Sequence, residues 1–157
     1  MRVQIGNKAP DFELPDQLGF QIRLYDVIGA ENIVLFFYPK DDSPGCTKEA
    51  CAFRDSYEVF QEYGAEVIGI SSDNEVSHKR FAEKLNLPYT LLSDKGGKVR
   101  KLYGVPKTMG FLPGRVTLVI DKQGVVRSIF NSQLNFKGHI EEALHILKSL
   151  DNNKNHL

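Results

Sequence analysis

Apolar residues along the chain fall into short runs with the periods of buried strands and amphipathic helices. Residues 33–38 and 66–71 are largely apolar, which is typical of strands that are covered on both faces. The segment between them, residues 47–61, contains neither Gly nor Pro and predicts a helix. A strand, a helix and a second strand in this order predict a right-handed unit with two parallel strands.

The rest of the chain adds two hairpins, a short strand and three helices to this unit. Together the elements predict an α/β protein with a thioredoxin-like fold, in which helices flank a central mixed sheet with an N-terminal β-hairpin. One domain is expected over residues 1–150, with a polar, frayed tail at residues 151–157. The added elements are a hairpin within residues 6–24, a helix capped by Ser72 or Asp73, a strand at 91–92, a helix at 97–103, a hairpin of strands 116–120 and 125–130, and a final helix bearing Ile140, Ala143, Leu144, Leu147 and Leu150.

Both cysteines of the chain lie where the first buried strand gives way to the helix. Pro39, Pro44 and Gly45 interrupt regular structure until Cys46, which places its sulfur in the first helical turn. Unpaired backbone N–H groups and the positive end of the helix dipole favour a thiolate at that position. The sequence therefore predicts a reactive cysteine at Cys46.

The spacing of Cys46 and Cys51, five residues, limits how the two sulfurs can react with each other. In an intact helix their Cα atoms would lie roughly 8.6 Å apart, whereas a disulfide tolerates about 7 Å at most. On the helical wheel Cys46 belongs to the apolar stripe, and Cys51 falls beside Asp55 and Glu58. A disulfide between them would require the first turns of the helix to unwind.

Two other interpretations of the cysteines are weaker. A free cysteine is often a small buried hydrophobe, but here a Pro/Gly loop, a helix start and a partner on the opposite face coincide. Structural zinc needs four ligands, and the four histidines lie far from the cysteines in sequence without paired spacing. We therefore expect neither a metal nor a cofactor.

Composition and charge exclude several function classes. With 157 residues, 41% of them hydrophobic and 25% charged, the chain fits an ordinary globular protein. Twenty basic and twenty acidic side chains balance, so bulk charge favours neither nucleic acid nor an anionic membrane. The longest apolar run, residues 33–38, is too short to span a bilayer, and the N-terminus lacks an apolar signal core. Two cysteines in one local motif fit a reducing compartment. A cytoplasmic protein is expected, although a mature organellar form would look the same.

The residues around the cysteines resemble the peroxidatic motif of the peroxiredoxins. The motif is Pro39-x-x-x-Ser43-x-x-Cys46 with Cys51 five residues on, and the run YPKDDSPGCTKEACAFRD is similar to the Q-type group, also called bacterioferritin comigratory proteins. The resemblance covers most of the chain, from Gly6 to Asp121. That group usually has threonine at the position of Ser43, and serine keeps the hydroxyl but lacks the methyl that restricts the rotamer.

The resemblance implies a thiol-dependent peroxidase that reduces hydrogen peroxide and organic hydroperoxides. Cys46 would attack the peroxide, and its sulfenic acid would condense with Cys51 after local unwinding of the helix. Ser43 would offer a hydroxyl to the peroxide oxygens, while Pro39 would shield the sulfur. Thioredoxin, or else glutaredoxin, is the implied reductant, and a monomer is the implied state.

Strand topology supplies one further candidate. If residues 116–120 run antiparallel to residues 33–38, their first residue lies at the same sheet edge as the loop that leads to Cys46. Arg115 would then lie beside the sulfur, where its fork of donors could hold both sulfur and peroxide oxygen. The resemblance places the active-site arginine of the family at this same position.

Two groups of side chains outside the motif are also of interest. Met109, Phe111 and Leu112 lie in a loop flanked by Gly and Pro, and are candidates to line the entrance for the peroxide. A basic cluster is expected to be a solvated helix face; its members are Lys95, Lys98, Arg100 and Lys101.

Two rival functions remain open from the residues alone. A thioredoxin-type disulfide reductase would use a C-x-x-C pair at this helix start, but Ser43 occupies the first position and cannot carry the exchange. A non-enzymatic redox sensor or holdase would use opening of the helix to expose apolar surface to partners. Continuous peroxide consumption that depends on thioredoxin would support the peroxidase, whereas stoichiometric oxidation without turnover would support the sensor.

Overall fold

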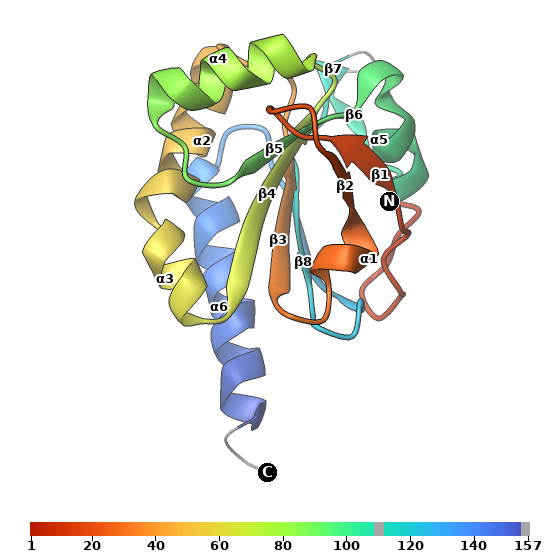
Figure 1. Ribbon diagram of the computed structural model, residues 1–157. Helices are drawn as coiled ribbons and strands as arrows, with labels where there is room; N and C mark the ends of the chain where they lie inside the picture. Colours follow the sequence, from red (N-terminus) through yellow and green to blue (C-terminus); the bar gives the residue numbers. More distant parts are fainter. Residues whose placement is uncertain (109–111, 155–157) are drawn as a thin grey trace.

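The computed structural model describes residues 1–108 and 112–154, and a five-stranded sheet forms its centre (Figure 1). The strand order is β5-β4-β3-β8-β9, with β3, β4 and β5 parallel and β8 antiparallel to both neighbours. The mixed sheet expected from the sequence is thereby confirmed. Its strands are β3 (Asn32–Phe37), β4 (Ala65–Ser71), β5 (Thr90–Ser93), β8 (Val116–Ile120) and β9 (Val126–Asn131).

The central strand β3 is buried on both faces, which explains its continuous apolar sequence. Ile33, Leu35 and Phe37 point into the core on one side of the sheet, whereas Val34 and Phe36 point into the core on the other. Each face of the sheet is therefore packed against its own layer of other elements.

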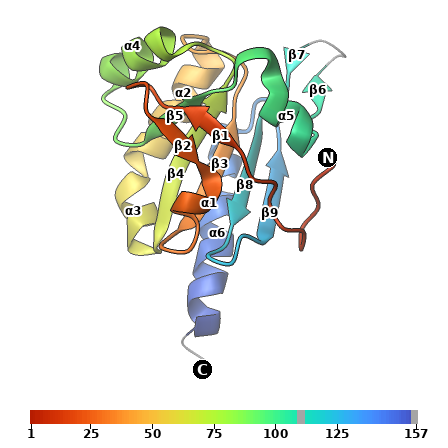
Figure 2. The same ribbon diagram turned by 45° about the vertical axis from the view of Figure 1, so that its right-hand side comes forward.

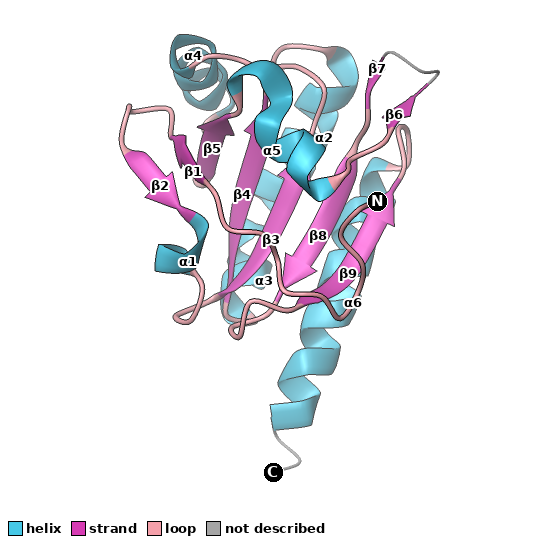
Figure 3. Ribbon diagram, turned by 90° about the vertical axis from the view of Figure 1, so that its right-hand side faces the viewer, coloured by secondary structure: helices cyan, strands magenta, loops and turns pink. Residues whose placement is uncertain are grey.

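Four helices cover one face of the sheet, and they lie behind it in Figure 3. Phe53 of the helix at Pro44–Asp55 and Phe60 of the helix at Tyr57–Glu62 belong to the same apolar cluster, with ring centroids 5.8 Å apart. In Figure 2 the far end of the last helix projects beyond the sheet. The four are α2 (Pro44–Asp55), α3 (Tyr57–Glu62), α4 (Glu75–Leu85) and α6 (Phe136–Lys154).

The N-terminal segment and two short helices cover the opposite face. Leu14 of β1 and Leu24 of α1 pack in the same cluster as Tyr103 of α5. The N-terminal hairpin expected from the sequence is present as the antiparallel pair β1 and β2. The elements here are β1 (Glu13–Pro15), β2 (Gln21–Arg23), α1 (Leu24–Val27), η1 (Lys95–Gly97) and α5 (Lys98–Tyr103), and the short strands β6 (Lys107–Thr108) and β7 (Leu112–Pro113) pair beyond them.

Helix boundaries differ from the sequence-based expectation at three places. The helix expected over residues 47–61 breaks at Ser56, whose ψ of 2° lies outside the helical range, so that α2 and α3 are separate. Neither Ser72 nor Asp73 caps α4; Asn74 does so, its side chain accepting from the Ser77 amide. The carboxylate of Asp73 is already occupied by other donors. Helix α6 continues through residues 151–154, where the sequence predicts fraying.

The last helix is also the longest, with 19 residues. Within residues 1–108 and 112–154, no helix combines the length and the apolar character needed to cross a membrane.

Candidate active site

The two strands at the centre of the sheet bring the candidate residues to one edge. Phe37, the last residue of β3, lies opposite Val116, the first residue of β8. The loop from β3 to α2 and the residue before β8 therefore meet at this edge, which places Arg115 beside the N-terminus of α2. The antiparallel pairing expected from the sequence is confirmed.

Cys46 lies in the first turn of α2, as the sequence predicts. Ser43 is at the N-cap position, Pro44 begins the helix, and the Thr47 amide donates to the Ser43 carbonyl at 2.9 Å. Cys46 is 1% exposed and belongs to the same apolar cluster as Phe53.

Cys51 lies in the same uninterrupted helix and is half-buried. Both thiols are free. The structure thus represents the reduced protein with its helix intact.

Arg115 points both terminal nitrogens at the sulfur. Nη1 and Nη2 each lie 3.5 Å from Cys46 Sγ, while Nε donates to the Gln133 carbonyl at 3.1 Å. The guanidinium lies 5.0 Å from the ring centroid of Phe136, at the start of α6. Burial alone would lower the pKa of Arg115, but its electrostatic attraction and hydrogen bonds to Glu49 and Cys46 outweigh burial and raise the pKa above its usual value.

Glu49 is a site residue that the sequence reasoning missed. It is fully buried, and its Oε1 accepts from Arg115 Nη1 at 2.9 Å. Burial raises the pKa of Glu49 to about 7, although Arg115 opposes that rise. The sequence did contain a signal for this residue. Glu49 is a charged side chain one helical turn after Cys46, on a stripe whose other residues are apolar.

His139 of α6 lies on the far side of this carboxyl group and was also missed. Its Nδ1 is 2.8 Å from Thr117 Oγ1, and its Nε2 is 2.7 Å from the Ser132 carbonyl. A carbonyl can only accept, so Nε2 carries hydrogen and Nδ1 accepts from the threonine. Burial, the main cause, lowers the pKa of His139 to about 4, and Arg115 adds to that effect while the Ser132 carbonyl opposes it.

The other two candidates lie in the loop before α2. Ser43 Oγ donates to the Lys40 carbonyl at 3.0 Å, so its hydroxyl is directed at the loop in this state. Pro39 is half-buried and directly follows the buried Tyr38. Of the candidate entrance residues, Met109 and Phe111 lie outside the described residues, and Leu112 begins β7.

The expectation that the basic cluster is solvated holds for Lys95, Lys98 and Lys101 and is wrong for Arg100. Arg100 is buried and donates to the carbonyls of Gly114 and Tyr38, at 2.8 and 2.9 Å. Arg100 therefore links Tyr38, at the start of the loop before α2, to Gly114, which precedes Arg115. Local sequence does not reveal this contact, because the three residues lie in separate segments of the chain.

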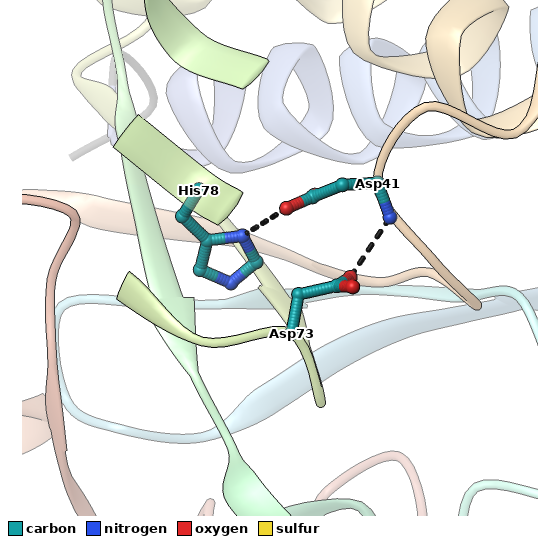
Figure 4. A group of neighbouring side chains, drawn as sticks. All are labelled: Asp41, Asp73 and His78. Carbon is teal, nitrogen blue, oxygen red and sulfur yellow. Dashed lines mark hydrogen bonds and ion pairs between the residues drawn. The ribbon is translucent and has the colours of Figure 1, made fainter. Parts of the chain in front are cut away.

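A buried polar cluster anchors the middle of the same loop (Figure 4). The Asp41 carboxylate accepts from Tyr38 Oη at 2.6 Å and Ser77 Oγ at 2.8 Å, and it lies 2.7 Å from His78 Nδ1. The Asp41 amide donates to Asp73 Oδ2 at 2.8 Å. We call these five residues the loop clamp, because they tie the loop before α2 to α4 and to the segment between β4 and α4.

Both ring nitrogens of His78 have partners. Nδ1 lies 2.7 Å from the Asp41 carboxyl group, and Nε2 lies 3.0 Å from the Leu92 carbonyl. Since a carbonyl only accepts, Nε2 donates to Leu92, and the buried ring is hydrogen-bonded on both sides.

The chemistry of the clamp also resembles a metal triad, since Asp41, Asp73 and His78 each present a ligand atom within 4.8 Å of the others. These atoms already accept or donate hydrogen bonds within the protein, with Ser71 Oγ also donating to Asp73 Oδ2 at 2.6 Å. The contacts thus describe a hydrogen-bonded anchor for the loop.

Comparisons with known proteins agree on one family. The AhpC/TSA family model matches residues 5–129. Peroxiredoxin Q, chloroplastic, from Arabidopsis thaliana is 57% identical over 149 residues, covering 94% of this chain and 68% of that protein. The crystal structure of peroxidoxin BcpB from Mycobacterium tuberculosis superposes with a TM-score of 0.87 at 40% identity, covering 94% of this chain and 97% of that one.

A second solved structure carries the other name of the group. The Xanthomonas campestris bacterioferritin comigratory protein, described for its alkyl peroxide reduction activity, has a TM-score of 0.82 at 27% identity, covering 94% of this chain and 96% of that one. Family model, relatives and folds coincide over most of the chain, which therefore belongs to the AhpC/TSA family and, within it, to the peroxiredoxin Q group.

Proposed function

We propose that this thiol peroxidase reduces hydroperoxides with Cys46 as the attacking thiolate and Cys51 as the resolving thiol. The observation that carries the assignment is the position of Cys46 Sγ, which lies at a helix N-terminus with two guanidinium nitrogens of Arg115 at 3.5 Å. A thiolate is the form of cysteine that such an environment stabilises.

The first step forms a sulfur–oxygen bond and breaks the oxygen–oxygen bond of the peroxide. Cys46 attacks the terminal oxygen, and negative charge develops on the oxygen that leaves. The fork of Arg115 is placed to contact both the sulfur and that oxygen. Gln133 and Glu49 hold the fork in this orientation through the hydrogen bonds given above.

Ser43 and Pro39 shape the approach of the peroxide. The Ser43 hydroxyl, which donates to the Lys40 carbonyl, rotates to donate to a peroxide oxygen. Pro39 has no N–H and fixes the loop as it leaves the sheet, which limits the access of water to the sulfur.

Resolution requires the helix to open. The sulfenic acid at Cys46 condenses with the Cys51 thiol, releasing water and forming a disulfide. Both residues lie in one intact helix, in which their Cα atoms are roughly 8.6 Å apart. The first turns of α2 therefore unwind in each catalytic cycle.

The partners follow from this chemistry. An external dithiol protein of the thioredoxin type, or else a glutaredoxin, reduces the disulfide. The substrates are hydrogen peroxide and alkyl hydroperoxides, the latter supported by the activity named for the Xanthomonas protein. We place the protein in a reducing compartment, the cytoplasm or the chloroplast named for its plant relatives, and expect a monomer.

A steady-state assay tests the proposed function. Purified protein should consume peroxide continuously in the presence of thioredoxin, thioredoxin reductase and NADPH, at a rate far above that of free cysteine. Oxidation that stops after one equivalent of peroxide per protein would instead indicate a redox sensor or holdase. Reduction of a disulfide substrate without peroxide would indicate a disulfide reductase.

Arg115→Lys should reduce the rate of peroxide reduction about 100-fold. Lysine keeps the positive charge but cannot direct two parallel donors at sulfur and oxygen. The second-order rate constant for oxidation of Cys46, followed in a single turnover, measures the loss. Lys101→Arg is the control. It also exchanges one cationic side chain for another, but at an exposed position on α5, and it should leave the rate unchanged. A rate within threefold, or about 0.6 kcal/mol, of the unsubstituted protein would contradict the role of the fork.

A further inference from the structure

One buried carboxyl group beside Cys46 holds Arg115 in place, yet its charge has no role in the mechanism above. Glu49 lies one helical turn after Cys46, on the same face of α2. Its Oε2 has no hydrogen-bond partner among the residues that the structure describes. An ionised carboxylate with one bare oxygen in a buried place costs more free energy than a neutral carboxylic acid.

Arg115 is the cation that Glu49 and Cys46 have in common. Its Nη1 lies 2.9 Å from Glu49 Oε1 and 3.5 Å from Cys46 Sγ. All three side chains are at most 5% exposed. Two anions around one buried cation would leave a negative charge without compensation, which is unfavourable at low dielectric.

The other titratable groups that face Glu49 are neutral. His139 Nε2 is 3.7 Å from Glu49 Oε2, but it donates to the Ser132 carbonyl, and the lowered pKa of His139 keeps the ring uncharged at neutral pH. Burial raises the pKa of Tyr89 well above its usual value. Neither group compensates a carboxylate.

Arg100, the second buried arginine, does not change this balance. Its guanidinium donates to the carbonyls of Gly114 and Tyr38, and the charges that act on it are those of Asp94 and Cys46. Because Arg100 interacts with Cys46, its charge favours an anion on the Cys46 sulfur over an anion on Glu49.

We propose that Cys46 and Glu49 share one negative charge opposite Arg115. Glu49 is a carboxylic acid while Cys46 is a thiolate, and it becomes a carboxylate when oxidation removes the charge from the sulfur. The inference rests on the proposed role of Cys46 as the nucleophile. Glu49 is a positioning residue in this scheme, because it acts through Arg115.

The proton balance of the peroxide step is then complete within the site. Cys46 thiolate, Glu49 carboxylic acid and ROOH yield Cys46 sulfenic acid, Glu49 carboxylate and ROH. The sulfur–oxygen bond forms, the oxygen–oxygen bond breaks, sulfur is oxidised, the peroxide is reduced, and the proton lost by Glu49 balances the one gained by the leaving alkoxide. Arg115 faces one anion before and after the step. A pKa of about 7 allows Glu49 to change state near neutral pH.

Infrared spectroscopy of the reduced protein tests the shared charge without any turnover. The C=O stretch of a protonated buried carboxyl group is assigned to Glu49 by its loss in Glu49→Gln. We expect this band to titrate about one pH unit or more higher in the unsubstituted protein than in Cys46→Ser, a tenfold difference in proton affinity. Cys51→Ser is the matched control and should leave the midpoint unchanged. Circular dichroism checks that each variant keeps its helices.

A peroxide pulse supplies the second readout. In Cys51→Ser, one equivalent of peroxide should remove the Glu49 band as the sulfenic acid forms. Equal midpoints in the unsubstituted protein and Cys46→Ser, or a carboxylate at Glu49 throughout the neutral range, would overturn the proposal. Failure of the proposed function would appear separately, as peroxidase turnover retained in Cys46→Ser.

Discussion

Cys46→Ser should abolish peroxide reduction, whereas Cys51→Ser should react once with peroxide and then stop. A serine hydroxyl is not ionised near neutral pH and cannot attack the oxygen–oxygen bond, so at least a 1,000-fold loss, about 4 kcal/mol in activation free energy, is expected for the first variant. Cys51→Ser keeps the nucleophile but offers no thiol to its sulfenic acid. Single-turnover kinetics and thioredoxin-dependent turnover, measured side by side, separate the two roles.

Mass spectrometry of the unsubstituted protein gives the complementary result. After peroxide the chain should lose two hydrogens, with a crosslink between the peptides that contain Cys46 and Cys51. The far-ultraviolet circular dichroism signal should lose helix at the same time, because the disulfide cannot form in the intact α2. Turnover retained in Cys46→Ser, or a crosslink with the helix signal unchanged, would contradict the mechanism.

Asp41→Asn should destabilise the folded protein by about 1 to 3 kcal/mol. Asparagine keeps the size of the side chain but replaces one acceptor oxygen with a donor nitrogen, so the contacts of residue 41 with Tyr38 Oη, Ser77 Oγ and His78 Nδ1 cannot all be kept. Urea denaturation of the reduced protein measures the loss. Hydrogen exchange at the amide of residue 41 should also accelerate, because the loop clamp holds that amide against Asp73.

Asp42→Asn is the matched control for this substitution. Asp42 adjoins Asp41 but is exposed, and its ion pair with Lys84 is 3.4 Å long at the surface. Its φ of 64° lies in the left-handed region, which asparagine tolerates well. A loss below about 1 kcal/mol is therefore expected. Equal, small losses for both substitutions would show that the clamp does not anchor the loop.

The loop clamp holds its segment in place, whereas the proposed mechanism needs α2 to unwind, and the two can coexist because they act on different residues. The clamp holds residue 41, which precedes Pro44 at the start of the helix. The turns that open in the proposed mechanism begin after this anchor. Opening can thus be confined to the start of α2 while the loop stays attached to the sheet.

The boundaries of the elements show where local sequence is sufficient and where it is not. The apolar run that became β3 was recognised because burial on both faces leaves no polar position in the strand. The cap of α4 was misassigned because Asp73, a suitable capping residue by type, accepts from Asp41 and Ser71 instead. The break at Ser56 was missed because no Gly or Pro marks it in the sequence.

The sequence by itself established the family resemblance, and it is the basis of two proposals, that Cys46 is the reactive position and that the helix opens for the disulfide. These depend on residues 39–51, whose Pro, Gly and Cys spacing sets a helix start and a distance along the helix. Strand order extended the same reasoning to Arg115, which topology and the family motif placed at the correct edge.

Only the tertiary structure decided what surrounds the sulfur. Glu49 and Arg115 are 66 residues apart, and Asp41 and His78 are 37 apart, so no local pattern links them. The preference of a buried charge for a partner depends on distances and on the exclusion of water, which exist only once the sheet and its helices have packed. The charge distribution of the site is therefore a property of the fold.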